Sequence, residues 1–201
     1  MTLGSGVPQF VTHYHLPDRR PFLNLSDLGE AEAFEVMGAL LTMRTEGLQN
    51  RSFGRVYLKW RQATESRMRA LFLEQGGEPV RRTPHYFVLG ESRWYAGLAL
   101  DMQALSIPLD CLPSSQASFT LVDSFTAMGL GPEFGVPHTP EPHQAKLYRF
   151  EDLAETVRAH GLPGDEPPAD GYKGYEWRPV TQFIEVQLWC DDPIADFLKQ
   201  S

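Results

Sequence analysis

The apolar residues of this chain change their spacing near Pro84, and this change constrains the fold more than any other feature of the sequence. Before it, apolar side chains recur as on one face of a helix, and after it they form the short runs typical of strands. Helices and strands in separate blocks are typical of the α+β class. The pattern predicts a single domain over residues 1–201, with a helical layer at about 27–75 packed on a mixed or antiparallel sheet formed mainly by residues 84–190.

Two amphipathic helices are expected in the first part of the chain. Asp27 and Glu30 resemble a capping box, which marks a helix start, and the helical spacing continues to about Thr45. Gly76 and Gly77 predict the end of the second helix, whose other face carries arginine and lysine. The apolar stripes comprise Leu28, Ala31, Phe34, Met37, Leu40 and Leu41 in the first helix, and Phe53, Val56, Trp60, Ala63, Met68, Leu71 and Phe72 in the second.

Short apolar and alternating runs predict the strands, which are expected at residues 11–16, 85–90, 104–109, 118–122, 146–150 and 182–189. The run at 95–100 suggests a further strand, with a helix as the alternative. Residues 151–160 predict a helix that ends at Gly161. In the last strand, one face should carry Ile184, Val186 and Leu188, and the other Phe183, Glu185, Gln187 and Trp189.

The overall composition is that of an ordinary globular protein, with 42% apolar and 22% charged residues. No apolar run approaches the roughly 20 residues needed to cross a bilayer, and the first residues lack the basic and apolar regions of a signal peptide. We therefore expect a cytoplasmic protein without a membrane partner. The chain contains no G-x-G-x-x-G and no P-loop, so these two modes of nucleotide binding are not supported.

The charge is distributed unevenly, although the net charge is −8. Residues 44–93 hold ten basic side chains against five acidic ones, and most of the basic residues are arginines. Arginine is suited to bidentate contacts with phosphate, so this segment could present a positive surface to nucleic acid. The alternative is that these residues form a solvated helix face.

Glu185 lies in the middle of an otherwise apolar and aromatic strand, where a carboxylate is costly unless it is solvated or paired. One interpretation places it on the solvated face of an edge strand. The other places it in a cleft walled by Phe183 and Trp189, as an acid that orients or polarises a substrate hydroxyl.

His13 and His15 flank Tyr14, so on a strand their two imidazoles project from the same face, as in H-x-H metal sites. A third ligand at useful spacing is not evident. A metal-dependent hydrolase using His13 and His15 is therefore kept as one alternative function, beside ordinary histidines at the end of a strand.

Several strings occur in an order that resembles the DarT-type ADP-ribosyltransferases, toxins that use NAD to modify a base of single-stranded DNA. They are the histidine strand Thr12 to His15 with Asn24 and Leu25 downstream, TPHYFVLGESRWYAGL (Thr83 to Leu98), FTLVDSFTAM (Phe119 to Met128), LYRFEDL (Leu147 to Leu153) and FIEVQLWCDDPI (Phe183 to Ile194). Together they cover about a quarter of the chain. The resemblance implies an ADP-ribosyltransferase-like fold, NAD as substrate and no metal.

The resemblance also assigns roles to residues. It makes Glu185 the catalytic acid, His13 or His15 the contact to the nicotinamide ribose, Arg51 or Arg55 the contact to phosphate, and Tyr86 and Ser92 part of the nicotinamide pocket. It implies nucleic acid, approached by the basic segment 44–93, and an antitoxin as partners. The acceptor stays open, because a base, a protein side chain and water all need only a nucleophile beside the same pocket. A non-catalytic binding or regulatory protein is the main alternative.

Overall fold

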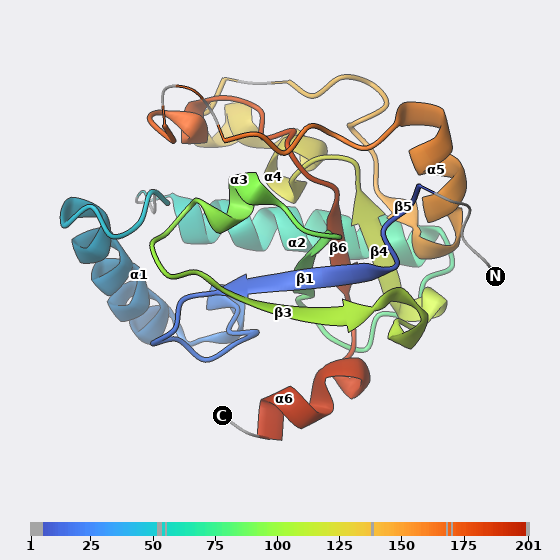
Figure 1. Ribbon diagram of the computed structural model, residues 1–201, viewed down its shortest axis with the longest axis horizontal. Helices are drawn as coiled ribbons and strands as arrows, with labels where there is room; N and C mark the ends of the chain where they lie inside the picture. Colours follow the sequence, from blue (N-terminus) through green and yellow to red (C-terminus); the bar gives the residue numbers. More distant parts are fainter. Residues whose placement is uncertain are drawn as a thin grey trace.

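The computed structural model describes residues 6–51, 54, 56–137, 139–167, 169 and 171–199. Its centre is a six-stranded antiparallel sheet in the order β3-β1-β2-β6-β4-β5 (Figure 1). The strands are β1 (Phe10–His15), β2 (His85–Leu89), β3 (Gln103–Pro108), β4 (Ala117–Thr120), β5 (Tyr148–Arg149) and β6 (Glu185–Leu188). The expected α+β class is confirmed.

The helices cover the two faces of this sheet unequally. They are α1 (Glu30–Thr45), α2 (Tyr57–Glu74), α3 (Arg93–Ala96), α4 (Ser124–Met128), α5 (Leu153–His160) and α6 (Ala195–Lys199). The long helix α2 lies behind the sheet in Figure 1, and its Phe72 packs against Trp189 just after β6. The opposite face is covered by Leu153 and Val157 of α5 and by Ile194, which leads into α6.

Strand pairing decides which side chains share a face. Val88 of β2 lies opposite Glu185 of β6, and Tyr86 lies opposite Gln187, so these four side chains point to the side of α2. Val186 and Leu188 point to the other side, into the main core. The predicted alternation of the last strand is confirmed, although the regular strand is shorter than expected.

β1 and β2 separate beyond their first contacts. β1 pairs with β3 along its whole length, but it pairs with β2 only at Val11 and Thr12. Beyond these residues the imidazole of His13, rather than the backbone, donates to the carbonyl of Tyr86, at 2.9 Å. The two strands therefore leave an opening at the centre of the sheet.

Two local predictions are wrong. The run at 95–100 contains no strand: residues 93–96 form α3, because the Ser92 side chain accepts the N–H of Tyr95 and so caps a helix. Asp27 does not cap α1, whose N-cap is Gly29. Instead its carboxylate binds Arg81 and accepts the hydroxyl of Thr83.

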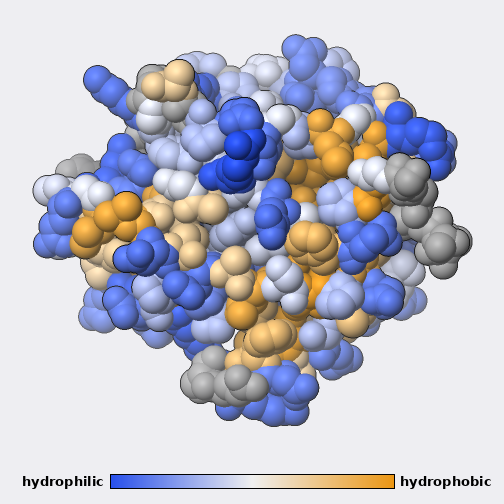
Figure 2. Space-filling view, in the orientation of Figure 1, coloured by the Kyte–Doolittle hydropathy of each residue, from blue (hydrophilic) through white to orange (hydrophobic). Residues whose placement is uncertain are grey.

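Helix α1 is less amphipathic than its sequence suggests. Ala33, Met37 and Leu40 are buried, but Phe34 and Leu41 of the expected stripe are 47% and 50% exposed. Figure 2 shows apolar side chains gathered over α1 at the left of the molecule. The spacing is compatible with two apolar faces, and only one of them packs on the rest of the domain.

No helix in the described part of the chain is both long and apolar enough to cross a membrane. The longest, α2, has 18 residues, and charged side chains such as Lys59 and Arg67 interrupt it. The sequence likewise predicts no spanning segment.

Candidate active site

Two adjoining cavities, of about 160 and 180 Å³, form a continuous cleft at the opening between β1 and β2. The first extends over His13, His15 and the segment that follows β1, and the second extends toward α4. Five residues line both cavities: Arg51, Tyr57, Arg61, Tyr95 and Glu185. Among the residues predicted from sequence, Glu185, His13, His15, Arg51 and Tyr86 thus come together around one cleft.

Glu185 lies where the two cavities meet. It is 7% exposed and is paired on both sides, with β2 and with β4, so the interpretation as a solvated edge-strand residue is wrong. Burial raises the pKa of Glu185 to about 7; nearby Arg61 opposes this rise and Asp123 adds to it. Phe183 lines the cleft as expected, but Trp189 does not, because it packs on Phe72 at a ring distance of 5.9 Å.

Arg61 of α2 reaches the same junction. Its guanidinium lies 4.6 Å from the ring centre of Tyr86 and 4.3 Å from that of Phe125, and Nη2 donates to the hydroxyl of Tyr57. Nη1 is buried without a hydrogen-bond partner among the described residues, and Arg61 forms no ion pair with any of them. A buried cation with an unused donor is costly, so this arrangement favours an anionic ligand in the cleft.

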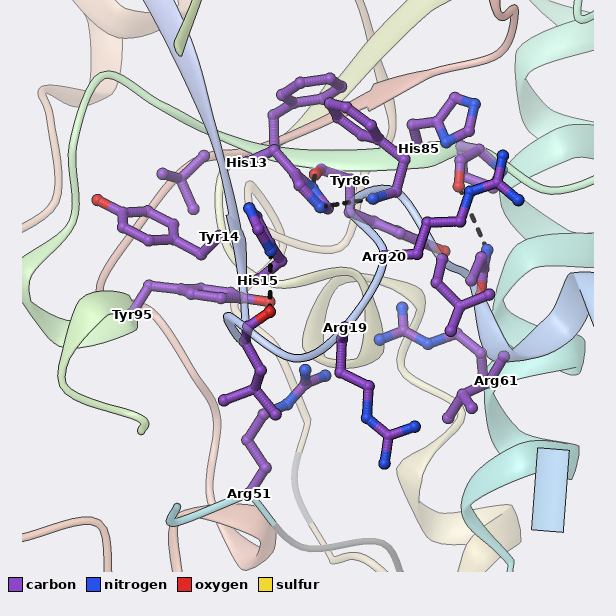
Figure 3. A pocket seen from close by; sticks show the side chains of 18 of the residues that line it. His13, Tyr14, His15, Arg19, Arg20, Arg51, Arg61, His85, Tyr86 and Tyr95 are labelled. Atoms are coloured by element: carbon purple, nitrogen blue, oxygen red, sulfur yellow. Dashed lines mark hydrogen bonds between the residues drawn. The ribbon is translucent and has the colours of Figure 1, made fainter. Parts of the chain in front are cut away.

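Further arginines face the first cavity. Figure 3 shows the guanidinium groups of Arg19, Arg51 and Arg61 extending into the same space below His15. Arg20 also lines the cavity, and it donates to the carbonyl of Leu198 at 3.3 Å. The cleft therefore has a cationic half despite the net negative charge of the chain.

The second half of the cleft is aromatic. Its walls include Trp60, Phe125, Phe134, Phe183 and Trp177. Such walls suit a planar ring, which stacks on or against aromatic side chains.

Tyr86 is held from behind by a buried carboxylate. Its hydroxyl donates to Oε1 of Glu65 at 2.9 Å, and the amide of Asn24 donates to the same oxygen at 2.9 Å. Burial, together with the charge of Glu65, holds the pKa of Tyr86 well above its usual range. The phenol therefore stays neutral and presents its ring to Arg61.

Both ring nitrogens of His13 already have partners. Nδ1 bonds the carbonyl of Tyr86, so Nε2 accepts the N–H of Phe22 at 2.9 Å, and the ring of Phe22 stacks on the imidazole at 4.2 Å. Burial lowers the pKa of His13 to about 4, which keeps the ring neutral. In this arrangement His13 has no free ring nitrogen for a ribose. His15 bonds the carbonyl of Leu16 through Nδ1 and has Nε2 available.

The other predicted site residues are placed as follows. Arg51 lines both cavities, whereas Arg55 lies outside the described residues. Ser92 does not line the cleft: its side chain caps α3, and its N–H donates to the hydroxyl of Tyr14 at 3.0 Å. It supports the cleft indirectly, because the Tyr14 ring stacks on that of Tyr95.

Two arginines of the basic segment 44–93 are paired with acidic side chains from other parts of the chain. Arg81 binds Asp27 and Asp191, and Arg93 binds Asp165 and Glu166. These arginines are paired within the protein, and from this segment Arg51 and Arg61 reach the cleft.

The positions of His13 and His15 give little support to the alternative of a metal-dependent hydrolase. His13 and His15 share one side of β1 with ring centres 6.0 Å apart, but Nε2 of His13 is occupied. Within the described ranges, no three His, Cys, Asp or Glu side chains lie together as a candidate metal site.

Comparison with protein-family models, curated proteins and solved structures finds no match to this chain. The resemblance to DarT-type enzymes therefore stays a prediction, and the chemistry of the cleft has to be argued from its own residues.

Sequence reasoning missed three of these residues. In the sequence, Arg61 counts only as one of the basic residues of segment 44–93 and Glu65 is not singled out, yet both are turned inward. Their spacing of four residues places them on one face of α2 with Trp60 nearby, and that signal was present in the sequence. Arg19 lies outside the basic segment, and only the path of the chain after β1 brings it to the cleft.

Proposed function

We propose that this protein cleaves the nicotinamide glycosidic bond of NAD and transfers the ADP-ribosyl group to an acceptor. The observation that carries the proposal is the meeting of Glu185 and Arg61 at the junction of a cationic and an aromatic cavity. NAD joins a charged pyrophosphate to two planar rings, and each half of the cleft suits one of these chemical types.

The cationic half would bind the pyrophosphate. Arg19, Arg51 and Arg61 approach it from three different segments, and a guanidinium binds phosphate oxygens with charge-assisted hydrogen bonds. The unused Nη1 of Arg61 supplies one such donor. His15 is the histidine that fits a ribose hydroxyl, since Nε2 of His13 is engaged.

Glu185 would act on the ribose. When the bond between ribose C1′ and the nicotinamide nitrogen breaks, its electron pair goes to the nicotinamide, which leaves neutral, and positive charge develops on the sugar. A carboxylate in a water-poor site stabilises this charge, and the acceptor then bonds to C1′ and loses its proton. Glu185 serves this role when ionised, so activity should increase as the pH rises through about 7.

The acceptor we propose is a nucleic-acid base, because the aromatic half of the cleft, whose lining includes Arg178, would suit a second planar ring beside the ring of NAD. The support is local to the cleft, because Arg81 and Arg93 of the basic segment are paired with acidic side chains of this chain. An antitoxin partner follows from the resemblance alone.

The test is release of nicotinamide from NAD by the purified protein, with and without single-stranded DNA. Glu185→Gln should lower the rate about 100-fold or more, the loss expected for a positioned catalytic group. Glu74→Gln, an exposed change on α2, is the matched control and should leave the rate unchanged. Nicotinamide release that is equal in wild type and Glu185→Gln would refute the role of Glu185, and binding of NAD without any release would favour a binding protein.

A further inference from the structure

A chain of buried side-chain hydrogen bonds ends on the carboxylate of Glu185. The indole N–H of Trp189 donates to Oγ of Ser118 at 2.9 Å, and Ser118 donates to Oε1 of Gln187 at 2.9 Å. The amide nitrogen of Gln187 lies 3.1 Å from Oε1 of Glu185 and 3.1 Å from Oγ1 of Thr120. Trp189, Ser118, Thr120 and Gln187 are all fully buried.

The direction of these hydrogen bonds follows from the chemistry of their partners. An indole nitrogen can only donate, so Ser118 accepts from Trp189, and the hydroxyl of Ser118 donates to Oε1 of Gln187. Thr120 gives its hydroxyl hydrogen to the carbonyl of Val122 at 2.7 Å, which leaves an oxygen lone pair for Gln187. The amide of Gln187 is therefore held with its oxygen toward Ser118 and its nitrogen toward Glu185.

We propose that Gln187 is a positioning residue that fixes the carboxylate of Glu185 in the cleft, and that Ser118 and Trp189 orient Gln187 for this task. The bond to Gln187 holds one carboxylate oxygen from the sheet side, while Glu185 still lines both cavities. The consequence of this positioning for catalysis rests on the proposed function, but the effect of Gln187 on the carboxylate of Glu185 does not.

The groups that face Glu185 come from several elements. Arg61 of α2 favours its charged form, and Asp123, at the start of α4, disfavours it. Tyr86 of β2, which burial keeps neutral, binds Glu65 through its hydroxyl, and Tyr57 of α2, which lines the same cavities, binds Arg61. The N–H of Gln187 favours the charged form, whereas a flipped amide would turn its oxygen to the carboxyl and favour the protonated form.

Loss of these hydrogen bonds should therefore raise the pKa of Glu185 above about 7. We expect Gln187→Leu to raise it by about one pKa unit, as expected for the loss of one hydrogen bond to a charged group. Ser118→Ala and Trp189→Phe should raise it by less but in the same direction, because they leave the amide free to turn. Phe72→Leu is the matched control: it disturbs the packing of Trp189 and keeps the indole hydrogen bond, so the pKa should not change.

The experiment is an NMR titration of the full chain with ¹³C-labelled glutamate carboxyl groups, in which the spectrum of Glu185→Gln assigns the signal. Rising values in Ser118→Ala and Trp189→Phe support the proposal. Unchanged or lower values in these two folded variants overturn it, even if Gln187→Leu does not fold. Nicotinamide release is measured beside it: if wild type releases none, the proposed function fails while the titration still decides the role of Gln187. If the wild type does release nicotinamide, the pH at which its activity is half-maximal should shift in each variant by the same amount as the pKa of Glu185.

Discussion

The carboxyl group of Glu185 is a weaker acid than usual because β6 places it between two strands and on the side of α2, away from water. Its folded-state pKa of about 7 lies above the ordinary value of 4.5 that applies in the unfolded chain. The folded protein therefore binds this proton more tightly. The contribution of Glu185 to stability is fully present below pH 4.5 and is lost as the pH rises through about 7.

Glu185→Gln should remove this loss, because glutamine resembles the protonated acid in shape and charge. We expect similar free energies of unfolding for wild type and variant near pH 4.5, and a more stable variant at pH 8, by up to roughly 3 kcal/mol. Urea unfolding between pH 4.5 and 8 measures the difference, with Glu74→Gln as control. A stability difference that does not vary with pH would contradict the assigned acidity.

His13 shows the opposite dependence and a different role. Its folded-state pKa of about 4 lies below the ordinary 6.5, so its contribution to stability is present above pH 6.5 and is lost as the pH falls through about 4. The sequence draws attention to His13 as one of two histidines on the same face of a strand. It does not reveal the bond from Phe22, because that bond requires the left-handed backbone of Phe22, at a φ of 61°, which bulky residues rarely adopt.

At the scale of elements, the change of spacing near Pro84 predicts most of the helices and strands. The failure at residues 95–100 has a clear cause: the apolar run is short enough to fit either structure, and the cap supplied by Ser92 decides for α3. The regular β6 is shorter than predicted because the ladder with β2 and β4 begins only at Glu185. Local patterns therefore predict which elements exist better than they predict where these end.

The end of α3 offers a test of how the aromatic half of the cleft is held. Gly97 follows α3, and a Cβ there would collide with the hydroxyl of Tyr172, which donates to the carbonyl of Trp94 at 2.7 Å. Gly97→Ala should lower the free energy of unfolding by about 1–3 kcal/mol, the usual cost of overpacking, and should displace the segment before Tyr175.

Gly38→Ala is the control for this change. Gly38 lies within α1, and a Cβ there meets nothing within 4 Å. Alanine is the better helix former, so this variant should gain roughly 0.5–1 kcal/mol. Chemical denaturation, monitored by tryptophan fluorescence, measures the free energy of unfolding of both variants. Equal effects of the two substitutions would show that the contact with Tyr172 is unimportant.

At the scale of the whole molecule, the cleft joins residues that are distant in sequence, from Arg19 to Glu185. Local patterns in the sequence indicate Glu185, His13 and His15, whereas Arg51 and Tyr86 are indicated only by the family resemblance. It cannot show that β1 and β2 separate, or that Arg81 and Arg93 are neutralised by acids from other segments. These features depend on tertiary contacts, which local spacing does not encode.

The most direct test of the central claim is calorimetric titration of NAD into Glu185→Gln, a variant chosen because it should bind NAD without consuming it. We predict binding that weakens at least about tenfold when Arg61→Gln is added, since a buried charge-assisted contact to phosphate is lost. Adding Arg67→Gln, an exposed change on the same helix, should leave the affinity unchanged. Absence of heat at millimolar NAD, with the protein folded, would contradict an NAD site in this cleft.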